Sequence, residues 1–473
     1  MKKLLGETII YGIGAILPRV ITFALTPFYI YFIDKEQFAQ FTNLYAWIAF
    51  VNILLTFGFE TSFFRFSSEK ENEKKVFNTS FWFLFALATT FLVSVLLFNE
   101  SIANAMGYPE NPEYIRWFAM MAFFDTLCVI PFAWLRFNGK PVKYSAVRVT
   151  QILVQTVFVL ALFLYIPKPF SSGLGLNDQV AYPFFSNVIG SLTGVLLLLP
   201  IMLKVRLQFV TPLFRRMFAY SYPVMFAGFA FMVNENFDKL IQYYKIPVGD
   251  AGAYGGCYKL AVLMTLFVTA YRMGVEPFFF KQMRKADAKK TYAKVTEYFT
   301  LFASAAAMGI IANISWLKTI FITDREYWTA IDIVPVVIIA NLCFGIYYNL
   351  STWYKVTDRT SVGTFISWFG ALITIALNWF LLEKYGFMVS AWATLAAYFG
   401  MMILSYFLGQ KYYPIPYNTG KLVFVLVLLS VFTVISYQLF NANVWIGNAL
   451  FLIFAGIILY GEKDFVLSKI RNR

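Results

Sequence analysis

The chain has 473 residues, of which 60 % are hydrophobic and 14 % charged, and its mean hydropathy is +0.65. These values lie far outside the range of water-soluble domains, so the composition excludes a soluble globular protein. The sequence contains no histidine, which excludes imidazole catalysis and histidine-ligated metal sites. The three cysteines fall in apolar segments, where a reduced and packed thiol is the ordinary case.

Apolar runs of about 17 to 25 residues, long enough to cross a membrane as helices, fill nearly the whole chain. Runs of this length exclude a barrel, whose strands would be shorter and would alternate in polarity. The sequence therefore predicts an all-α polytopic membrane protein with about 14 transmembrane helices. The expected spans are 8–33, 38–61, 78–98, 114–134, 149–166, 181–203, 218–237, 251–277, 295–316, 331–354, 362–382, 388–408, 422–440 and 446–460.

The net charge of +14 is distributed unevenly between the two sides of these spans. The two ends of the chain and every second loop carry 28 lysines and arginines, whereas the intervening loops carry 7. By the positive-inside rule, the first set is cytoplasmic, both termini lie inside, and the number of spans is even. Because orientation accounts for the charge, no nucleic-acid partner is needed. The apolar run near the start continues through Phe32 without a cleavage site, so we expect a first span rather than a signal peptide.

The loops argue against an enzyme. No segment between predicted spans exceeds about 15 residues, which leaves no room for a catalytic domain on either face. No GxxxxGK[ST] phosphate loop is present, so the chain is not expected to hydrolyse nucleotides. The prediction is a protein without enzymatic activity, cofactor or metal, which leaves transport or a structural role.

A short motif occurs twice, as GFETSFFRF at 58–66 and GVEPFFFKQ at 274–282. Upstream of it, IDKEQFAQFTNLYAW at 33–47 parallels IPVGDAGAYGGCYKL at 246–260. Chance similarity between apolar sequences is the alternative, but the shared glycine, glutamate and cation favour a duplication of about six spans. Because six is an even number, both copies enter the membrane from the same side, which gives parallel repeats. We therefore expect an N-lobe over 1–217, a C-lobe over 218–421, and two further helices with a cytoplasmic tail over 422–473. The matched pairs are Gly58/Gly274, Glu60/Glu276, Phe63/Phe279, Phe64/Phe280 and Arg65/Lys281.

Three further segments carry a resemblance to a known family. They are YSYPVMFAGFAFMVNENFDKLI at 220–241, ALNWFLLEKYGFMVSAWATLAAY at 376–398 and RFNGKPVKYSAVRVTQIL at 136–153. In their order and spacing, the chain resembles the polysaccharide transport branch of the multidrug, oligosaccharidyl-lipid and polysaccharide (MOP) flippase superfamily, the Wzx-type O-antigen flippases. The resemblance covers essentially the whole length.

The resemblance implies two six-helix lobes, two extra C-terminal helices and alternating access. It also implies that the cargo is an undecaprenyl-diphosphate-linked oligosaccharide, which is moved across the bacterial inner membrane. The cargo would serve the synthesis of surface polysaccharides such as the O-antigen of lipopolysaccharide. The protein is expected to act as a monomer. Three alternatives stay open: a lipid II flippase, a cation-coupled multidrug exporter of the same superfamily, and a membrane scaffold. Drug exporters of the superfamily typically have twelve spans.

Charged side chains inside the predicted spans are the candidate functional residues, because a charge at the bilayer centre costs at least ~2.5–3.5 kcal/mol. We expect Arg19, Lys259 and Arg272 to line the pathway and bind the diphosphate of the cargo. The alternative is that each cation neutralises a carboxylate, for example Arg19 with Asp125. Asp125 and Glu235 are candidates for cavity charges that bind a coupling proton or sodium ion.

The repeated glutamates lie nearer to the predicted cytoplasmic ends of their spans. Glu60 and Arg65 in the first half, with Glu276 and Lys281 in the second, are expected to form a latch or gate at the cytoplasmic mouth. Direct handling of substrate or ions by the glutamates is the alternative.

Overall fold

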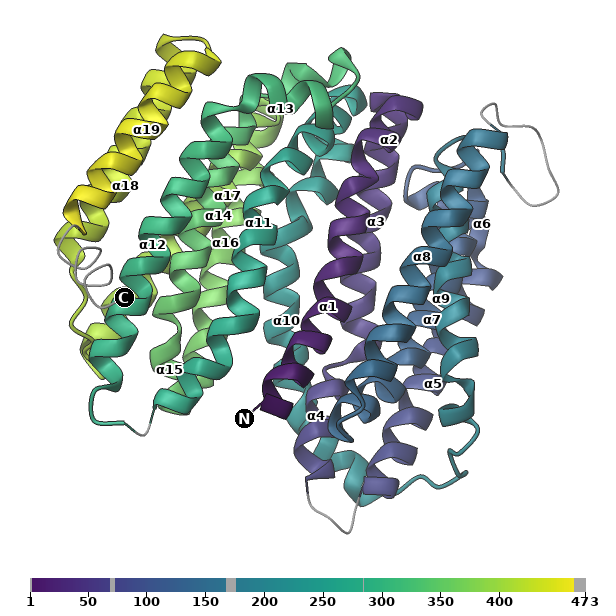
Figure 1. The fold of residues 1–473 in the computed structure, drawn as a ribbon. Coiled ribbons are helices and arrows are strands. Elements are labelled where there is room, and N and C mark those ends of the chain that lie inside the picture. The colour runs from purple at the N-terminus through teal and green to yellow at the C-terminus, as the bar shows by residue number, and fades with distance from the viewer. Residues whose placement is uncertain (1, 69–72, 167–175, 284, 463–473) are drawn as a thin grey trace. The chain divides into compact units, whose positions relative to one another are not determined.

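The computed structural model describes residues 2–68, 73–166, 176–283 and 285–462 (Figure 1), except for the side chains of 2–11, 277, 280 and 281. Throughout these ranges the regular elements are helices, with no strand. Fourteen segments within them are long and apolar enough to cross a membrane. The prediction of an all-α polytopic membrane protein with about 14 spans is therefore confirmed.

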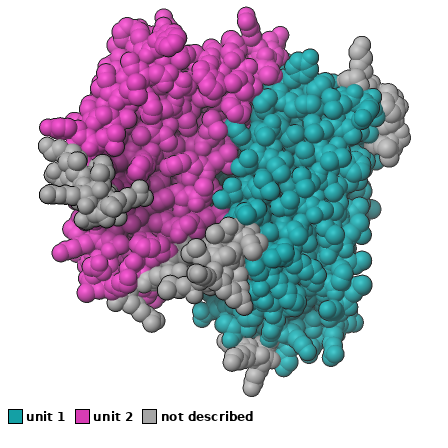
Figure 2. All heavy atoms as spheres, viewed as in Figure 1, with its two compact units in different colours: residues 1–240 teal, residues 241–473 magenta. Residues whose placement is uncertain are grey.

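The chain forms two compact units, residues 1–240 and 241–473, which Figure 2 distinguishes by colour. The helix α10 contains both this boundary and the predicted lobe boundary at 217/218. The separate division predicted at 421/422 stays a prediction. The helices up to this point are α1 Lys2–Ala24, α2 Thr26–Phe32, α3 Lys35–Thr56, α4 Phe59–Ser67, α5 Glu73–Leu97, α6 Asn99–Ala105, α7 Pro112–Phe137, α8 Pro141–Tyr165, α9 Ala181–Met202 and α10 Thr211–Lys245.

The second unit contains the seven spans that follow α10, together with shorter helices that join or extend them. The last two spans, α18 and α19, pack against α12 at one edge of this unit (Figure 1). The elements are α11 Val248–Gln282, α12 Ala288–Ala312, α13 Ile314–Phe321, η1 Arg325–Ala330, α14 Ile333–Leu350, α15 Thr352–Val356, α16 Thr360–Tyr385, α17 Met388–Tyr412, α18 Thr419–Val434, η2 Ile435–Leu439 and α19 Val444–Gly461.

The same packing pattern recurs in both units. In the first, the fourth span α7 packs against α3, α5 and α9, and α8 packs against α9. In the second, the tenth span α14 packs against α11, α12 and α17, and α16 packs against α17. Because corresponding spans make corresponding contacts, the duplication seen in sequence extends to three-dimensional packing.

Small residues permit the close approach of helices inside each unit. A Cβ atom at Gly190 of α9 would lie 3.1 Å from the backbone oxygen of Gln151 in α8, so the missing side chain lets the two helices lie close together. The first span bends where α1 ends at Ala24, before Pro27 in the first turn of α2. Proline has no N–H and restricts the residue before it, which accounts for a break rather than a continuous helix.

The repeated Gly-x-Glu motif has a different backbone in its two copies. Phe57 and Gly58 both adopt positive φ, 49° and 68°, and they separate α3 from α4. A Cβ atom at Gly58 would also lie 2.9 Å from the carbonyl oxygen of Ser221 in α10. Gly274 instead lies within the continuous helix α11, with open space around it. One sequence motif thus ends a helix in the first half and continues a helix in the second.

Two predicted span boundaries need correction. The fifth span was expected to begin at 149, but α8 begins at Pro141, because proline is well suited to the first turn of a helix. The seventh was expected to end at 237, but α10 continues to Lys245. Both corrections add charged residues to the spans, namely Lys143 and Arg148 in α8 and Asp238, Lys239 and Lys245 in α10.

Candidate functional site

Asp125 lies in the middle of α7 and contacts two neighbouring helices. Its carboxylate accepts a hydrogen bond from Ser191 of α9 and lies close to the Arg148 guanidinium of α8. That guanidinium lies over the Phe132 ring, with 4.0 Å between Cζ and the ring centroid. The carboxylate therefore accepts one hydrogen bond and is stabilised electrostatically by Arg148 without forming an ion pair with it, which lowers the cost of its charge in a membrane.

Arg148, rather than Arg19, is the cation beside Asp125, so the alternative pairing of Arg19 with Asp125 is wrong for this conformation. The Arg19 side chain is exposed, and it makes no ion pair with any residue that the structure describes. It follows Pro18 in α1, where the proline carbonyl accepts a hydrogen bond from Thr22 Oγ1 at 2.9 Å. Arg19 is thus a cation in a spanning helix that is open to an anionic partner.

The second unit gathers charged and aromatic side chains near the predicted cytoplasmic ends of α11 and α14. Arg272 lies 4.7 Å from the Tyr348 ring centroid, and Lys355 Nζ lies 3.9 Å from the same centroid. Glu276 Oε1 accepts a hydrogen bond from Lys355 Nζ at 3.2 Å and is also bonded to the Tyr348 hydroxyl. Two cations therefore share one carboxylate, which leaves this cluster with a net positive charge.

Lys259 and Arg272 lie on the same helix but not at the same place. Thirteen positions along α11 separate their Cα atoms by about 20 Å and turn them about 140° apart around the axis. Lys259 is half-buried, whereas Arg272 is exposed. The structure therefore does not bring these two candidates into one anion site. Their predicted contact with the diphosphate remains a prediction, and α11 presents the two cations at different depths.

Each repeated glutamate pairs with a cation in the fourth span of its own half. Glu60 Oε1 lies 2.5 Å from Arg136 Nη1, 76 residues away, and Glu276 pairs with Lys355, 79 residues away. The partner of Glu60 is therefore not Arg65, whose Cζ atom lies 5.1 Å from the centroid of the Tyr220 ring, and the latch or gate role stays a prediction. The side chain of Lys281 lies outside the described residues.

Glu235 is half-buried on α10, and its backbone carbonyl accepts a hydrogen bond from Lys239 Nζ at 3.0 Å. The same ammonium forms an ion pair with Asp238 at 3.0 Å, and Asp238 is buried. Within the described residues, no group of three His, Cys, Asp or Glu side chains gathers in a way that could hold a metal ion. Around Glu235, the charged groups of α10 thus include an ion pair between the adjacent residues Asp238 and Lys239.

A separate polar cluster lies outside the spans, between α7 and α9. Asp178 accepts hydrogen bonds from the Tyr114 hydroxyl and from the backbone N–H of Ala181, the latter at 3.0 Å. Buried Glu113 lies nearby and accepts a hydrogen bond from Asn177 at 3.0 Å. Burial, aided by the neighbouring Glu113 charge, raises the pKa of Asp178 above its usual range. This cluster fastens residues 177 and 178, just before α9, to the first turn of α7.

Several of these residues were missed in the sequence. Arg148 was assigned to a loop, although Pro141 marks the start of the helix that carries it. Arg136 and Lys355 were counted only as cytoplasmic cations, although both terminate the fourth span of a repeat. Aligning the two halves beyond the glutamate motif would have paired each glutamate with its partner.

Fourteen spans, two units with the same packing and charged clusters inside the spans define a polytopic membrane transporter. The model of the polysaccharide biosynthesis protein family matches residues 4–283, more than half of the chain. The chain therefore belongs to this family and, with it, to the MOP superfamily of flippases.

Similarity to known proteins agrees with this assignment. The lipid II flippase MurJ, in an inward closed conformation, superposes with a TM-score of 0.77 at 15 % identity, over 97 % of this chain and 100 % of that one. An inward-facing multidrug resistance MATE family transporter of the MOP superfamily gives 0.62 at 13 % identity, over 85 % and 97 %. A protein of the Lsg locus of Haemophilus influenzae is 19 % identical over 397 residues, 80 % of this chain and 92 % of the relative.

Proposed function

We propose that the protein moves an undecaprenyl-diphosphate-linked oligosaccharide from the inner to the outer leaflet of the bacterial cytoplasmic membrane, for a surface polysaccharide such as O-antigen. In this proposal the protein works as a monomer by alternating access, with both termini in the cytoplasm. Membership of the polysaccharide biosynthesis family supports the process, and the MurJ-like fold supports the type of movement.

We choose this cargo because cations outnumber carboxylates around the candidate residues. Arg272 and Lys355 share Glu276, and Arg19 makes no ion pair within the described part of the chain. A diphosphate carries about two negative charges whose desolvation is unfavourable, and guanidinium groups offset it through charge-assisted hydrogen bonds. We therefore assign Arg19 and Arg272 to contact with the diphosphate, and Lys259 to a second contact at another depth.

We assign the paired glutamates the role of a structural latch at the predicted cytoplasmic ends of their spans. Glu60 with Arg136, and Glu276 with Lys355, each join the second and fourth spans of one half. Because each pair lies within its own half, it keeps that half rigid while the halves move. Arg65 and Lys281 would meet phospholipid headgroups or cargo at the mouth, which is the snorkelling behaviour expected of long cationic side chains there.

The two other transport functions, lipid II flipping and drug export, differ from each other in the charge of the cargo and in the coupling of transport to an ion gradient. Lipid II shares the diphosphate linkage, so the same cations would serve it, and the relative MurJ is a lipid II flippase by name. A cationic drug would be repelled by Arg19 and by the cluster around Arg272. Ion coupling through Asp125 or Glu235 is compatible with either lipid cargo, although Ser191 and Arg148 already satisfy Asp125.

The test is flipping of a fluorescent, diphosphate-linked oligosaccharide lipid in proteoliposomes, read by quenching from outside. Removing one charge-assisted contact by Arg272→Gln should slow flipping by about 10- to 100-fold, whereas Arg272→Lys should retain part of the rate. Arg116→Gln is the matched control, because Arg116 is also an exposed cation of a spanning helix but is assigned no cargo contact. Equal rates in both glutamine variants would refute the diphosphate assignment. Selective flipping of lipid II, or of cationic dyes, would move the protein to one of the alternatives.

A further inference from the structure

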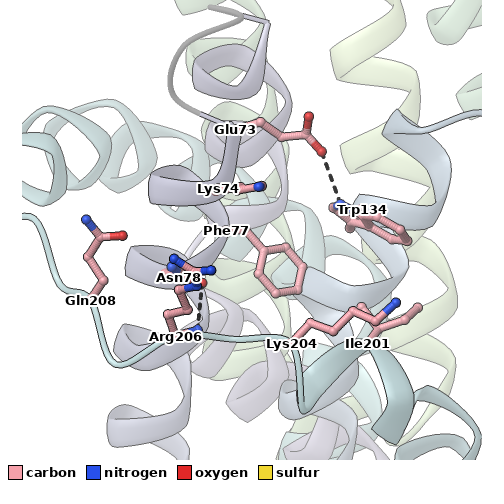
Figure 3. Close-up of a pocket in the computed structure, with 9 residues that line it drawn as sticks. All are labelled: Glu73, Lys74, Phe77, Asn78, Trp134, Ile201, Lys204, Arg206 and Gln208. Atoms are coloured by element: carbon pink, nitrogen blue, oxygen red, sulfur yellow. Dashed lines mark hydrogen bonds between the residues drawn. The ribbon is translucent and has the colours of Figure 1, made fainter.

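A second charged site, separate from the clusters in the spans, lies at one end of the first unit. A pocket of about 380 Å³ opens between the first turns of α5, the last turns of α7 and α9, and the segment 203–210 that joins α9 to α10. Figure 3 shows its lining, which consists of Glu73, Lys74, Phe77, Asn78, Trp134, Ile201, Lys204, Arg206 and Gln208. Its volume lies within the range of small-ligand sites.

The lining of this pocket is cationic. Lys74, Lys204 and Arg206 are exposed, and none of them forms an ion pair with a described residue. The single carboxylate, Glu73, accepts hydrogen bonds from Trp134 Nε1 at 3.1 Å and Asn138 Nδ2 at 3.0 Å, and Figure 3 shows it turned toward the tryptophan. Among the described residues the three cations have no carboxylate partner, which suits them to binding an external anion.

The segment that carries two of these cations is fastened to α5. The Arg206 backbone N–H donates to Asn78 Oδ1 at 3.2 Å, and the Arg206 carbonyl accepts a hydrogen bond from Trp82 Nε1 at 2.9 Å. Four residues on, the Val210 N–H donates to Thr79 Oγ1 at 3.3 Å. Because the backbone of the segment is held at Arg206 and Val210, the attachment points of its cations are fixed before any ligand arrives, which lowers the entropic cost of binding.

The same segment also exposes large apolar side chains between its polar ones. Leu203 is 76 % exposed and Leu207 is 89 % exposed, on either side of Lys204 and Arg206. Such side chains are unfavourable in water but stable at a membrane interface, where basic neighbours meet lipid phosphates. The alternation therefore places the pocket at the level of the phospholipid headgroups.

We infer that this pocket binds the phosphate of an anionic phospholipid in the leaflet at the predicted cytoplasmic ends of these helices. The ligand chemistry is a phosphate ester with at least one negative charge, held by Lys74, Lys204 and Arg206 beside the Trp134 indole. A soluble phosphate would share this chemistry, but it would leave the exposed Leu203 and Leu207 unexplained. The site is independent of the cargo, since it needs neither Arg19 nor Arg272.

The experiment counts lipids retained by the purified chain in a neutral detergent, using native mass spectrometry with added phosphatidylglycerol or phosphatidylcholine. Each cation near an anionic lipid changes affinity by about five-fold, so the variant K74Q/K204Q/R206Q should retain phosphatidylglycerol about 100-fold less strongly. The matched control K143Q/K285Q/K290Q removes three exposed cations that do not line the pocket, and it should bind as the wild type does.

Each outcome decides the proposal. An equal loss of phosphatidylglycerol retention in both triple variants would overturn the proposal, because the attraction would then be non-specific. Unchanged retention in the pocket variant would also overturn it, because the lipid would then bind elsewhere. Displacement of phosphatidylglycerol by millimolar inorganic phosphate, with Leu207→Ala unchanged, would overturn the lipid source in favour of a soluble phosphate. If the triple variant does not fold, Lys204→Gln on the exposed segment replaces it, with an expected loss of about five-fold.

Discussion

The ion pair between Glu60 and Arg136 gives the sharpest test of how each half is held together. Its side chains are 44 % and 45 % exposed, so the pair itself is worth about 0.2–1 kcal/mol. Arg136 also lies over the Phe64 ring at 5.0 Å, a contact worth about 0.5–1 kcal/mol at an exposed site. We therefore expect Arg136→Ala to lower the free energy of unfolding by about 1–1.5 kcal/mol. The melting temperature in detergent should fall by about 1–2 °C per kcal/mol.

The equivalent change in the second half should cost more. Lys355 and Glu276 are 23 % and 38 % exposed, and Lys355 also covers the Tyr348 ring. Lys355→Ala should therefore lower the free energy of unfolding by about 2 kcal/mol, since less water screens the pair.

Charge exchange identifies the partner. The double variant Glu60→Arg with Arg136→Glu should recover most of the melting temperature lost by either single variant, because it restores opposite charges at the same contact. Exchanging Glu60 with Arg65 should not, because Arg65 faces Tyr220. Recovery by the second exchange and not by the first would refute the assignment of Arg136 as the partner.

Three other predictions concern the backbone, pH and coupling. Gly58→Ala should lower the free energy of unfolding by about 1–2 kcal/mol, because Gly58 has a positive φ. Gly274→Ala should raise it by about 0.5–1 kcal/mol, because Gly274 lies in a helix with open space around it. Melting temperatures that shift in the same direction in both variants would contradict this contrast. Because the pKa of Asp178 is raised in the folded state, protonation of Asp178 favours folding, and stability should rise as the pH falls from neutral to about 4. Asp178→Asn should show a smaller rise in stability over this pH range. An equal pH dependence in the wild type and in Asp178→Asn would exclude Asp178 as its source. If Asp125 couples flipping to an ion, Asp125→Asn should abolish the response to an imposed proton or sodium gradient, and a wild-type rate insensitive to both gradients would dispose of the coupling.

The sequence predicted the helical architecture well because membrane crossing imposes a simple constraint. A span needs about 20 apolar residues, and α5, α9 and α17 show this directly in their composition. The breaks inside spans were not predicted. Phe57 adopts the left-handed conformation next to Gly58, and Gly58 packs against α10, a contact between residues far apart in the chain.

The candidate site was predicted in its residue types but not in its pairings. Glu60, Asp125 and Glu276 stood out because charges are rare in apolar runs. Their partners Arg136, Arg148 and Lys355 did not, since a cation near the end of a span looks like an ordinary cytoplasmic residue. Sequence spacing gives no distance between helices, whereas the packing of α7 against α3 and of α14 against α11 does.

The most direct test of the account is equilibrium binding of a short-chain polyprenyl diphosphate, compared with the corresponding monophosphate and alcohol. If cations in the spans select the diphosphate, the diphosphate should bind most tightly, and Arg272→Gln should weaken it by about 10- to 100-fold while leaving the alcohol unchanged. Equal affinity for the diphosphate and the alcohol, or no loss in Arg272→Gln, would contradict the claim that these cations recognise the cargo.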